Sequence, residues 1–168
     1  MIEVTLETIQ MSLVSPHRIV ILKELNEERY LPIWIGPCEA EAISVRLNHV
    51  EMPRPLTHDL IVALLETLGA KLIAIHITDL ADNTFYARLV MDLQGSEVLL
   101  DSRPSDALAV AVRLDVPIYV AESVLDEAGI VPEPDMGSEE GQESDENLGV
   151  FRDFLQKLDS DPGQENEG

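Results

Sequence analysis

A segment in the first half of the chain repeats without a gap 67 positions later, and this repeat limits the folds available to the chain. Residues 36–48 read GPCEAEAISVRLN and residues 103–115 read RPSDALAVAVRLD, with six identities in thirteen columns. The shared columns include a proline near the start and the run Val-Arg-Leu near the end. Two helices that begin alike would explain the match locally. An internal duplication would also predict that the flanking elements repeat.

The hydrophobic pattern indicates that the flanking elements do repeat. Alternating or β-branched runs predict three strands ahead of each copy, at 2–9, 17–25, 29–35, 71–78, 84–93 and 97–101. Each set leads into a predicted helix, over 38–47 and 105–114. The order strand, strand, strand, helix therefore occurs in two halves, at about 1–69 and 70–130. We predict an α+β fold in which a mixed or antiparallel sheet packs against helices.

Several local signals refine this outline. A proline-rich connector leads to a helix that we expect to begin at Thr57, whose hydroxyl is a suitable N-cap. Cys38 is expected to cap the helix of the first repeat, at the position where the second repeat has Ser105. Pro32 removes a donor from its strand and places that strand at an edge or a bulge. Trp34 is expected in the core. A short strand at 117–121 and a short helix at 122–128 complete the domain.

Length and charge indicate one domain followed by an acidic extension. The 168 residues suffice for one domain, predicted over 1–130. Residues 131–149 are acidic and nearly free of apolar side chains, so we predict a disordered linker. Residues 150–159 are predicted to form an amphipathic helix that docks on the domain or on a partner, and residues 160–168 a disordered tail.

The net charge of −21 restricts the partners. Residues 1–130 alone carry 20 acidic and 9 basic residues, so the domain itself repels phosphate backbones. This excludes nucleic-acid binders of the usual basic kind, but not a nuclease that touches its substrate through a few local cations. The single Cys38 excludes an intramolecular disulfide. The chain shows no signal peptide and no membrane-spanning run, so we expect a cytoplasmic protein without a membrane partner.

Two polar motifs provide the candidate chemistry. RPLTHD at 54–59 and RPSD at 103–106 each place an arginine, a proline, a hydroxyl and an acid at the start of a helix. Free amide groups and an arginine fork at such a position bind anions. Ordinary helix capping explains the same residues without a ligand.

Metal and proton chemistry would depend on a few of these side chains. The imidazole of His58 is a candidate general base or metal ligand. Asp59, Asp101 and Asp106 are candidate oxygen ligands for a divalent ion. No HxH, CxxC or DxD spacing is present, so no preformed metal site is predicted and no cofactor is assigned.

Three segments together resemble one known family. WIGPCEAEAI, PRPLTHDLI and DSRPSDALAVAVRLDVPIYV, in that order, are similar to the bifunctional nuclease (BFN) domain family of bacteria and plants, over about residues 1–130. The resemblance implies an α+β fold with a duplicated unit, assembly into homo-oligomers, and nuclease activity on RNA and DNA. The positions that match the family motifs are Glu39, Arg54, Thr57, His58, Asp59, Asp101, Arg103, Ser105 and Asp106.

We infer roles for these positions within a phosphodiesterase hypothesis. Arg54 and Arg103, with the hydroxyls of Thr57 and Ser105, would bind the scissile phosphate, and His58 would act as general base or acid. The catalytic aspartates Asp59, Asp101 and Asp106 would orient His58 or hold a divalent ion. Glu39 would help to position these residues without contacting the substrate itself. One alternative is a non-catalytic module that binds a small anion, a metabolite or a protein. Another is a structural seam between repeats or subunits.

Overall fold

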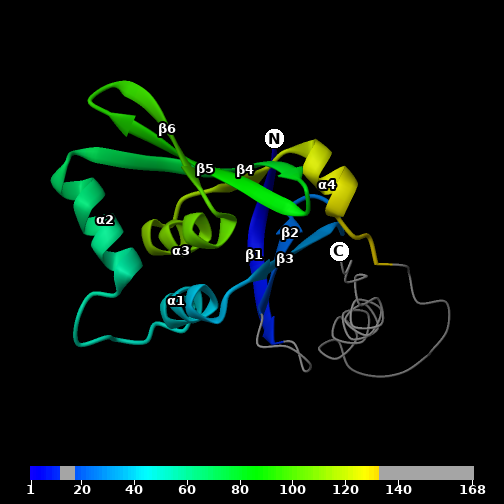
Figure 1. Ribbon diagram of the computed structural model, residues 1–168, viewed down its shortest axis with the longest axis horizontal. Coiled ribbons are helices and arrows are strands. Elements are labelled where there is room, and N and C mark those ends of the chain that lie inside the picture. The colour runs from blue at the N-terminus through cyan, green and yellow to red at the C-terminus, as the bar shows by residue number, and fades with distance from the viewer. Residues whose placement is uncertain (12–17, 133–168) are drawn as a thin grey trace, which may run out of the picture.

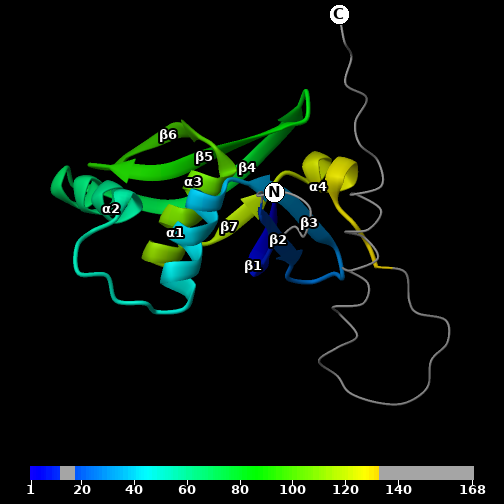
Figure 2. The same cartoon turned by 60° about the horizontal axis from the view of Figure 1, so that its bottom comes forward.

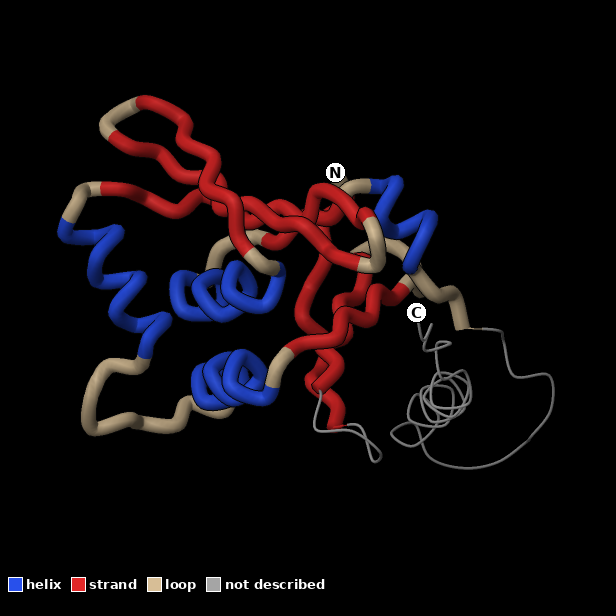
Figure 3. Tube along the Cα trace, viewed as in Figure 1, coloured by secondary structure: helices blue, strands red, loops and turns tan. Residues whose placement is uncertain are grey.

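The computed structural model describes residues 1–11 and 18–132, and within these ranges the fold is α+β (Figures 1 and 3). Seven strands form one curled sheet, and four helices accompany it. The strands are β1 (Ile2–Met11), β2 (Arg18–Glu24), β3 (Tyr30–Ile35), β4 (Ala70–Ala81), β5 (Thr84–Leu93), β6 (Ser96–Ser102) and β7 (Ile118–Val120). The helices are α1 (Pro37–Leu47), α2 (Thr57–Thr67), α3 (Pro104–Leu114) and α4 (Glu122–Ala128).

The strand order is β3-β2-β1-β7-β4-β5-β6. Two antiparallel meanders, β1–β3 and β4–β6, flank the short strand β7, which pairs antiparallel to β1 and parallel to β4. The predicted order of three strands and a helix therefore occurs twice, with α2 inserted after the first set. A common origin of the two sets remains a prediction.

Two tight hairpins align the second meander. Asp82 and Asn83 both have positive φ angles between β4 and β5, and so do Gln94 and Gly95 between β5 and β6. Two consecutive residues of this kind match the right-handed twist of a hairpin, and Asn and Gly adopt this conformation at low cost. Both turns are shorter than the sequence pattern indicated, because the strands continue to within two residues of each other.

The helices α1, α2 and α3 lie together on one side of the sheet, whereas α4 lies at the opposite end of the molecule from α2 (Figures 1 and 2). Each of α1 and α3 begins with a proline, whose missing N–H costs nothing at that position. The two helices pack closely because their contact faces contain small residues. The buried residues include Ala40, Ala42, Ile43, Ala107, Leu108, Ala109, Val110 and Ala111.

The core lies between the sheet and these helices. It consists mainly of branched aliphatic side chains, including the fully buried Leu22, Leu31, Ile75, Ile77, Val120 and Leu125. As predicted, Pro32 lies in a strand at the edge of the sheet. The prediction for Trp34 was wrong: its side chain is 44% exposed, because it alternates with the buried Ile33 and Ile35 along that strand.

The predicted linker, docking helix and tail at 131–149, 150–159 and 160–168 lie outside the described residues, apart from 131 and 132. In the described ranges, none of the helices is long and apolar enough to cross a membrane.

Candidate functional site

Four charged or polar side chains form a chain of hydrogen bonds where α1, α2 and α3 begin. His58 Nε2 lies 3.2 Å from Asp106 Oδ1, and Arg103 Nε donates to the other oxygen of that carboxylate at 2.6 Å. The Arg103 fork then reaches Glu39, with 2.7 Å between Nη2 and Oε1. Four of the predicted site residues, from both halves of the chain, are therefore in contact.

The local sequence at each helix start positions this network. Glu39 lies in the first turn of α1, and Asp106 has the equivalent place in α3. A Cβ atom at Gly36 would clash with the Glu39 carboxylate, so glycine at this position lets Glu39 fold back over the helix start and meet Arg103. His58 is the second residue of α2 and is only 7% exposed.

The network borders a cleft of about 570 Å³. Its lining combines apolar side chains with the network residues: Pro37, Cys38, Glu39, Glu41, Ala42, Leu56, Thr57, His58, Ile61, Arg103 and Asp106. The Arg103 side chain is 65% exposed, so its charge faces the cleft and solvent. The cleft therefore places one histidine and one exposed cation beside an apolar wall.

The hydrogen bond to Asp106 fixes the proton arrangement of the His58 ring. Burial on its own raises the pKa of the Asp106 carboxyl, but hydrogen bonds from Arg103 and His58 outweigh burial and lower this pKa. The ionised carboxylate only accepts, so Nε2 carries the hydrogen and Nδ1 of the neutral ring has a free lone pair. In the described part of the chain no buried polar side-chain atom lacks a partner, so Nδ1, which makes no hydrogen bond there, is not sealed from solvent, and His58 lines the cleft.

Arg103 is held at both ends of its fork. Its hydrogen bonds to Asp106, and then to Glu39, raise the pKa of the guanidinium above its ordinary value. Both carboxylates belong to helices that pack against each other, so the pair of bonds holds the guanidinium between the starts of α1 and α3, beside the cleft. It is a permanent cation whose orientation its partners determine.

Asp59 does not join this network, although it is adjacent to His58. Its Oδ2 accepts the backbone N–H of Leu56 at 2.7 Å, and its Oδ1 accepts from Arg113 Nε at 2.6 Å. Burial alone raises the pKa of Asp59, but the Leu56 N–H and Arg113 lower it below the ordinary range. Asp59 thus fixes the start of α2 and ties it to α3.

Arg113 is a residue to which the sequence analysis gave no role. Its side chain is 5% exposed, and its Nη1 donates to the backbone oxygens of Ala42 and Ala109 at 3.0 and 2.8 Å. It joins α1, α2 and α3 at one point. The signal was present in the repeat, where Arg46 and Arg113 occupy identical columns, and Arg46 Nε donates in turn to Val112 O at 3.4 Å.

The hydroxyl and thiol positions differ from the capping predictions. Thr57 is the first residue of α2, after the N-cap Leu56, and Gly36 and Arg103 are the N-caps of α1 and α3. None of these three helices has a side-chain hydrogen bond from its N-cap residue. The caps lie one residue or more earlier than predicted, and in α1 and α3 the proline at the first helical position already sets the helical φ. Cys38 and Thr57 line the cleft, whereas Ser105 is buried and does not.

Arg54 and Asp101 lie outside the cleft. Arg54 is exposed in the connector before α2 and lines a separate hollow beside Asp59 and Arg113. Asp101 is exposed on β6, opposite Arg88 of β5. The structure therefore does not bring the two predicted arginines Arg54 and Arg103 to one phosphate.

The three candidate aspartate ligands do not converge. Asp59 faces Arg113, Asp106 faces His58 and Arg103, and Asp101 lies on the neighbouring strand. Across residues 1–11 and 18–132, no group of three or more His, Cys, Asp or Glu side chains is arranged to hold a metal ion. We therefore derive no step through a metal.

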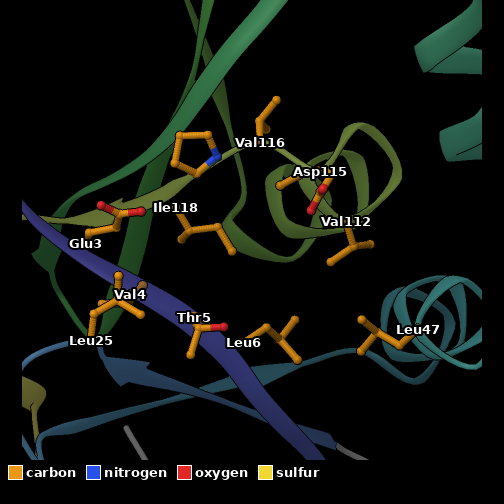
Figure 4. Close-up of a pocket in the computed structure, with 12 residues that line it drawn as sticks. Glu3, Val4, Thr5, Leu6, Leu25, Leu47, Val112, Asp115, Val116 and Ile118 are labelled. Atoms are coloured by element: carbon orange, nitrogen blue, oxygen red, sulfur yellow. The ribbon is translucent and has the colours of Figure 1, made fainter.

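A third hollow, of about 490 Å³, lies between β1, β7 and the C-terminal end of α3 (Figure 4). Its walls are formed largely by aliphatic side chains such as Val4, Leu6 and Ile118, and its charged members are Glu3 and Asp115. Among the described residues, its lining contains neither a histidine nor a cation, so it offers no imidazole base and no anion site. The cleft around His58 is the better candidate for chemistry.

Comparison with known proteins assigns the sequence to a family. The sequence model of the family described as bifunctional nuclease domain matches residues 20–133. An uncharacterized protein of Mycobacterium tuberculosis is 44% identical over 145 residues, which are 85% of this chain and 86% of that protein.

Plant relatives carry a functional name. Bifunctional nuclease 1 of Oryza sativa subsp. indica is 30% identical over 110 residues, and bifunctional nuclease 2 of Arabidopsis thaliana is 27% identical over 110 residues. Each alignment covers 63% of this chain and 33% of the plant protein, so this chain corresponds to about a third of those relatives. The family match over more than half of its length shows that the chain belongs to the bifunctional nuclease domain family.

Proposed function

We propose that the chain is a nuclease that hydrolyses phosphodiester bonds in RNA and DNA, with His58 as its general base. The observation that carries this proposal is the hydrogen bond between His58 Nε2 and Asp106 Oδ1 at the edge of the cleft. A carboxylate on one ring nitrogen sets the tautomer and stabilises the charged ring once the other nitrogen takes a proton. The names of the plant relatives supply the reaction class.

The proposed step uses groups of this chain and one water. His58 Nδ1 accepts a proton from the water while the water oxygen bonds to phosphorus. The bond from phosphorus to the leaving oxygen breaks, and that oxygen takes a proton from solvent. Arg103, exposed at the mouth of the cleft, stabilises the negative charge on the phosphoryl oxygens. Asp106 acts through His58 and Arg103 and is a positioning residue.

The charge of the cleft supports brief, local contact with the substrate. Glu39, Glu41 and Asp106 line it together with Arg103, so a polyanion meets one exposed cation, which is already paired with two of these carboxylates. The strongly acidic chain adds repulsion at longer range. We therefore expect weak substrate binding that depends on salt and not on base sequence.

A cleavage assay on single-stranded RNA and DNA tests the proposal. Purified wild-type protein should cleave both, and His58→Ala and Arg103→Ala should each lower the rate by at least about 100-fold. Matched controls are His49→Asn, at an exposed position with φ of 52°, and Arg88→Ala, at an exposed position on β5. If both site variants cleave at the wild-type rate, the active site does not lie at His58 and Arg103. If the wild type cleaves neither substrate, the chain is not a nuclease.

The cleft also favours a second function, a module that binds a small organic anion without turnover. Pro37, Leu56 and Ile61 give it an apolar wall, and Arg103 supplies one strong donor for a carboxylate or phosphate. A thermal-shift screen discriminates between the two functions. Stabilisation by a metabolite that is lost in Arg103→Ala, without nucleic-acid turnover, would favour this module.

We further propose that the chain acts as a homo-oligomer through α2. Leu60, Leu64 and Leu68 are 65%, 54% and 60% exposed at a spacing of four residues, while Ile61 and Leu65 pack against the core. Three leucines in a row on one exposed helical face form the kind of apolar patch that marks an interface. The same patch on a second copy is a matching partner, because a twofold interface pairs a surface with itself.

A further inference from the structure

A second cleft, of about 300 Å³, concentrates positive charge on an acidic protein. Arg46, Arg54 and Arg113 line it together with Asp59, and Met52 and Pro53 form part of its apolar wall. Residues 1–130 contain nine basic residues in all, and three of them meet here. The formal charge of the lining is +2, in a chain whose net charge is −21.

Two of these arginines have no carboxylate partner within the described residues. Arg103 is paired with Asp106 and Glu39, Arg29 with Glu24 and Asp126, and Lys23 with Glu28. Arg113 is neutralised by Asp59. In those ranges Arg46 and Arg54 make no ion pair, and both are exposed toward the same cleft. Their charge is therefore available to a ligand.

The cleft is built on fixed elements. Arg113 is a fixed part of the cleft wall, because Asp59 and the backbone carbonyls of Ala42 and Ala109 hold its guanidinium. Arg46 Nε donates to Val112 O at 3.4 Å, which leaves its two terminal nitrogens for an acceptor outside the protein. Two prolines flank Arg54 in the connector and limit its backbone freedom.

We propose that this cleft is a phosphate subsite that binds a non-scissile phosphodiester of the nucleic-acid backbone. Two planar guanidinium forks without counter-charge suit a phosphate, which accepts bidentate bonds and carries full charge. Among the described residues no aromatic side chain lines the cleft, so this lining offers no surface on which a base stacks. The site therefore recognises backbone and not sequence.

The position relative to His58 connects this inference to the proposed nuclease, on which it rests. His58 and Asp59 are consecutive residues at the start of α2, and His58 borders one cleft while Asp59 borders the other. A single strand that crosses the start of α2 would place one phosphate near His58 and another between Arg46 and Arg54. The second contact would hold the strand while the acidic chain repels it.

Binding measurements with the full chain test the subsite separately from cleavage. Fluorescence anisotropy follows a labelled single-stranded oligodeoxynucleotide on the His58→Ala protein, with a gel showing that the strand stays intact. Arg46→Gln and Arg54→Gln should each weaken binding about 5- to 10-fold for every base sequence and reduce the slope of log affinity against log salt by about one. Arg88→Gln, an exposed arginine of β5, controls for the loss of one charge.

The outcomes separate the subsite from the nuclease. Arg46→Gln and Arg54→Gln proteins that bind like Arg88→Gln would overturn the subsite, even if the wild type cleaves nucleic acid. Loss of binding in both, with no cleavage by the wild type, would support the subsite and reject the nuclease. Titration with inorganic phosphate identifies the source of the ligand: phosphate binding that needs both arginines, with unchanged oligonucleotide binding, would overturn the backbone assignment.

Discussion

The carboxylate of Asp106 connects His58 and Arg103 with one oxygen each. Oδ1 lies 3.2 Å from His58 Nε2 and Oδ2 lies 2.6 Å from Arg103 Nε, so a single side chain aligns both the proposed base and the proposed cation. His58 and Asp106 are 48 positions apart and belong to the first turns of two different helices. A substitution of Asp106 should therefore disturb the proposed base His58 and the proposed cation Arg103 at the same time.

Asp106→Asn tests the positioning role. The amide keeps the size of the side chain but supplies only one acceptor oxygen, so either His58 or Arg103 loses its partner. We expect kcat for RNA and DNA cleavage to fall about 10²- to 10⁴-fold with little change in KM. Asp101→Asn, on exposed β6, is the matched control. A variant that changes only KM, or a control that loses as much activity, would contradict the assignment.

Arg113→Ala tests the joint between the three helices. The change leaves the Asp59 carboxylate and the Ala42 carbonyl without their donor. The Arg113 side chain that makes these contacts is only 5% exposed. Because Asp59 is 37% exposed, we expect the free energy of unfolding to fall by about 3 kcal/mol, the lower end for a broken buried pair. Urea unfolding measures this difference. Arg88→Ala should stay within about 0.5 kcal/mol of wild type, and the same small loss in Arg113→Ala would contradict the joint.

Most of the fold could be predicted because its signals are local. Each of the seven strands was expected from alternation or β-branched runs, and the edge position of Pro32 follows from its missing donor. The element ends were less accurate. β4 continues to Ala81 because two positive-φ residues suffice for its hairpin, and sequence pattern does not distinguish a polar strand end from a turn. The α+β fold class and the family resemblance were both confirmed.

The site was predictable in part, because motif proximity indicates which helix starts carry polar groups but not which way each side chain points. His58 and Asp59 are adjacent, yet they border different clefts, because residues one apart on a helix face different directions. Arg54 and Arg103 occupy similar motifs, but only Arg103 is drawn into the network by Glu39 and Asp106. The catalytic roles remain predictions.

The depressed pKa values of Asp59 and Asp106 predict how stability depends on pH. Both carboxyls have a lower pKa in the folded chain than in the unfolded chain. Their contribution to stability is therefore fully present above about pH 4 and is lost as the pH falls through the folded pKa values. Urea unfolding between pH 7 and pH 3 should show a flatter acid limb for Asp59→Asn and Asp106→Asn than for wild type. Asp101→Asn should follow the wild-type curve. If Asp59→Asn and Asp106→Asn also follow the wild-type curve, the pH dependence of stability does not come from these two carboxylates.

If the exposed leucines of α2 form the interface of a homo-oligomer, charged substitutions there should dissociate it into monomers. Wild type should sediment as a species larger than the 18.6 kDa chain, and Leu60→Glu with Leu64→Glu should shift it to the monomer mass. Each buried leucine contributes roughly 2 kcal/mol to such an interface, and two carboxylates facing their own copies add repulsion. Ala63→Glu places one added charge on the same exposed helix without removing a leucine, and it should leave the assembly intact. Analytical ultracentrifugation decides between the outcomes: a monomeric wild type, or a double variant that assembles like wild type, would show that this face is not the interface.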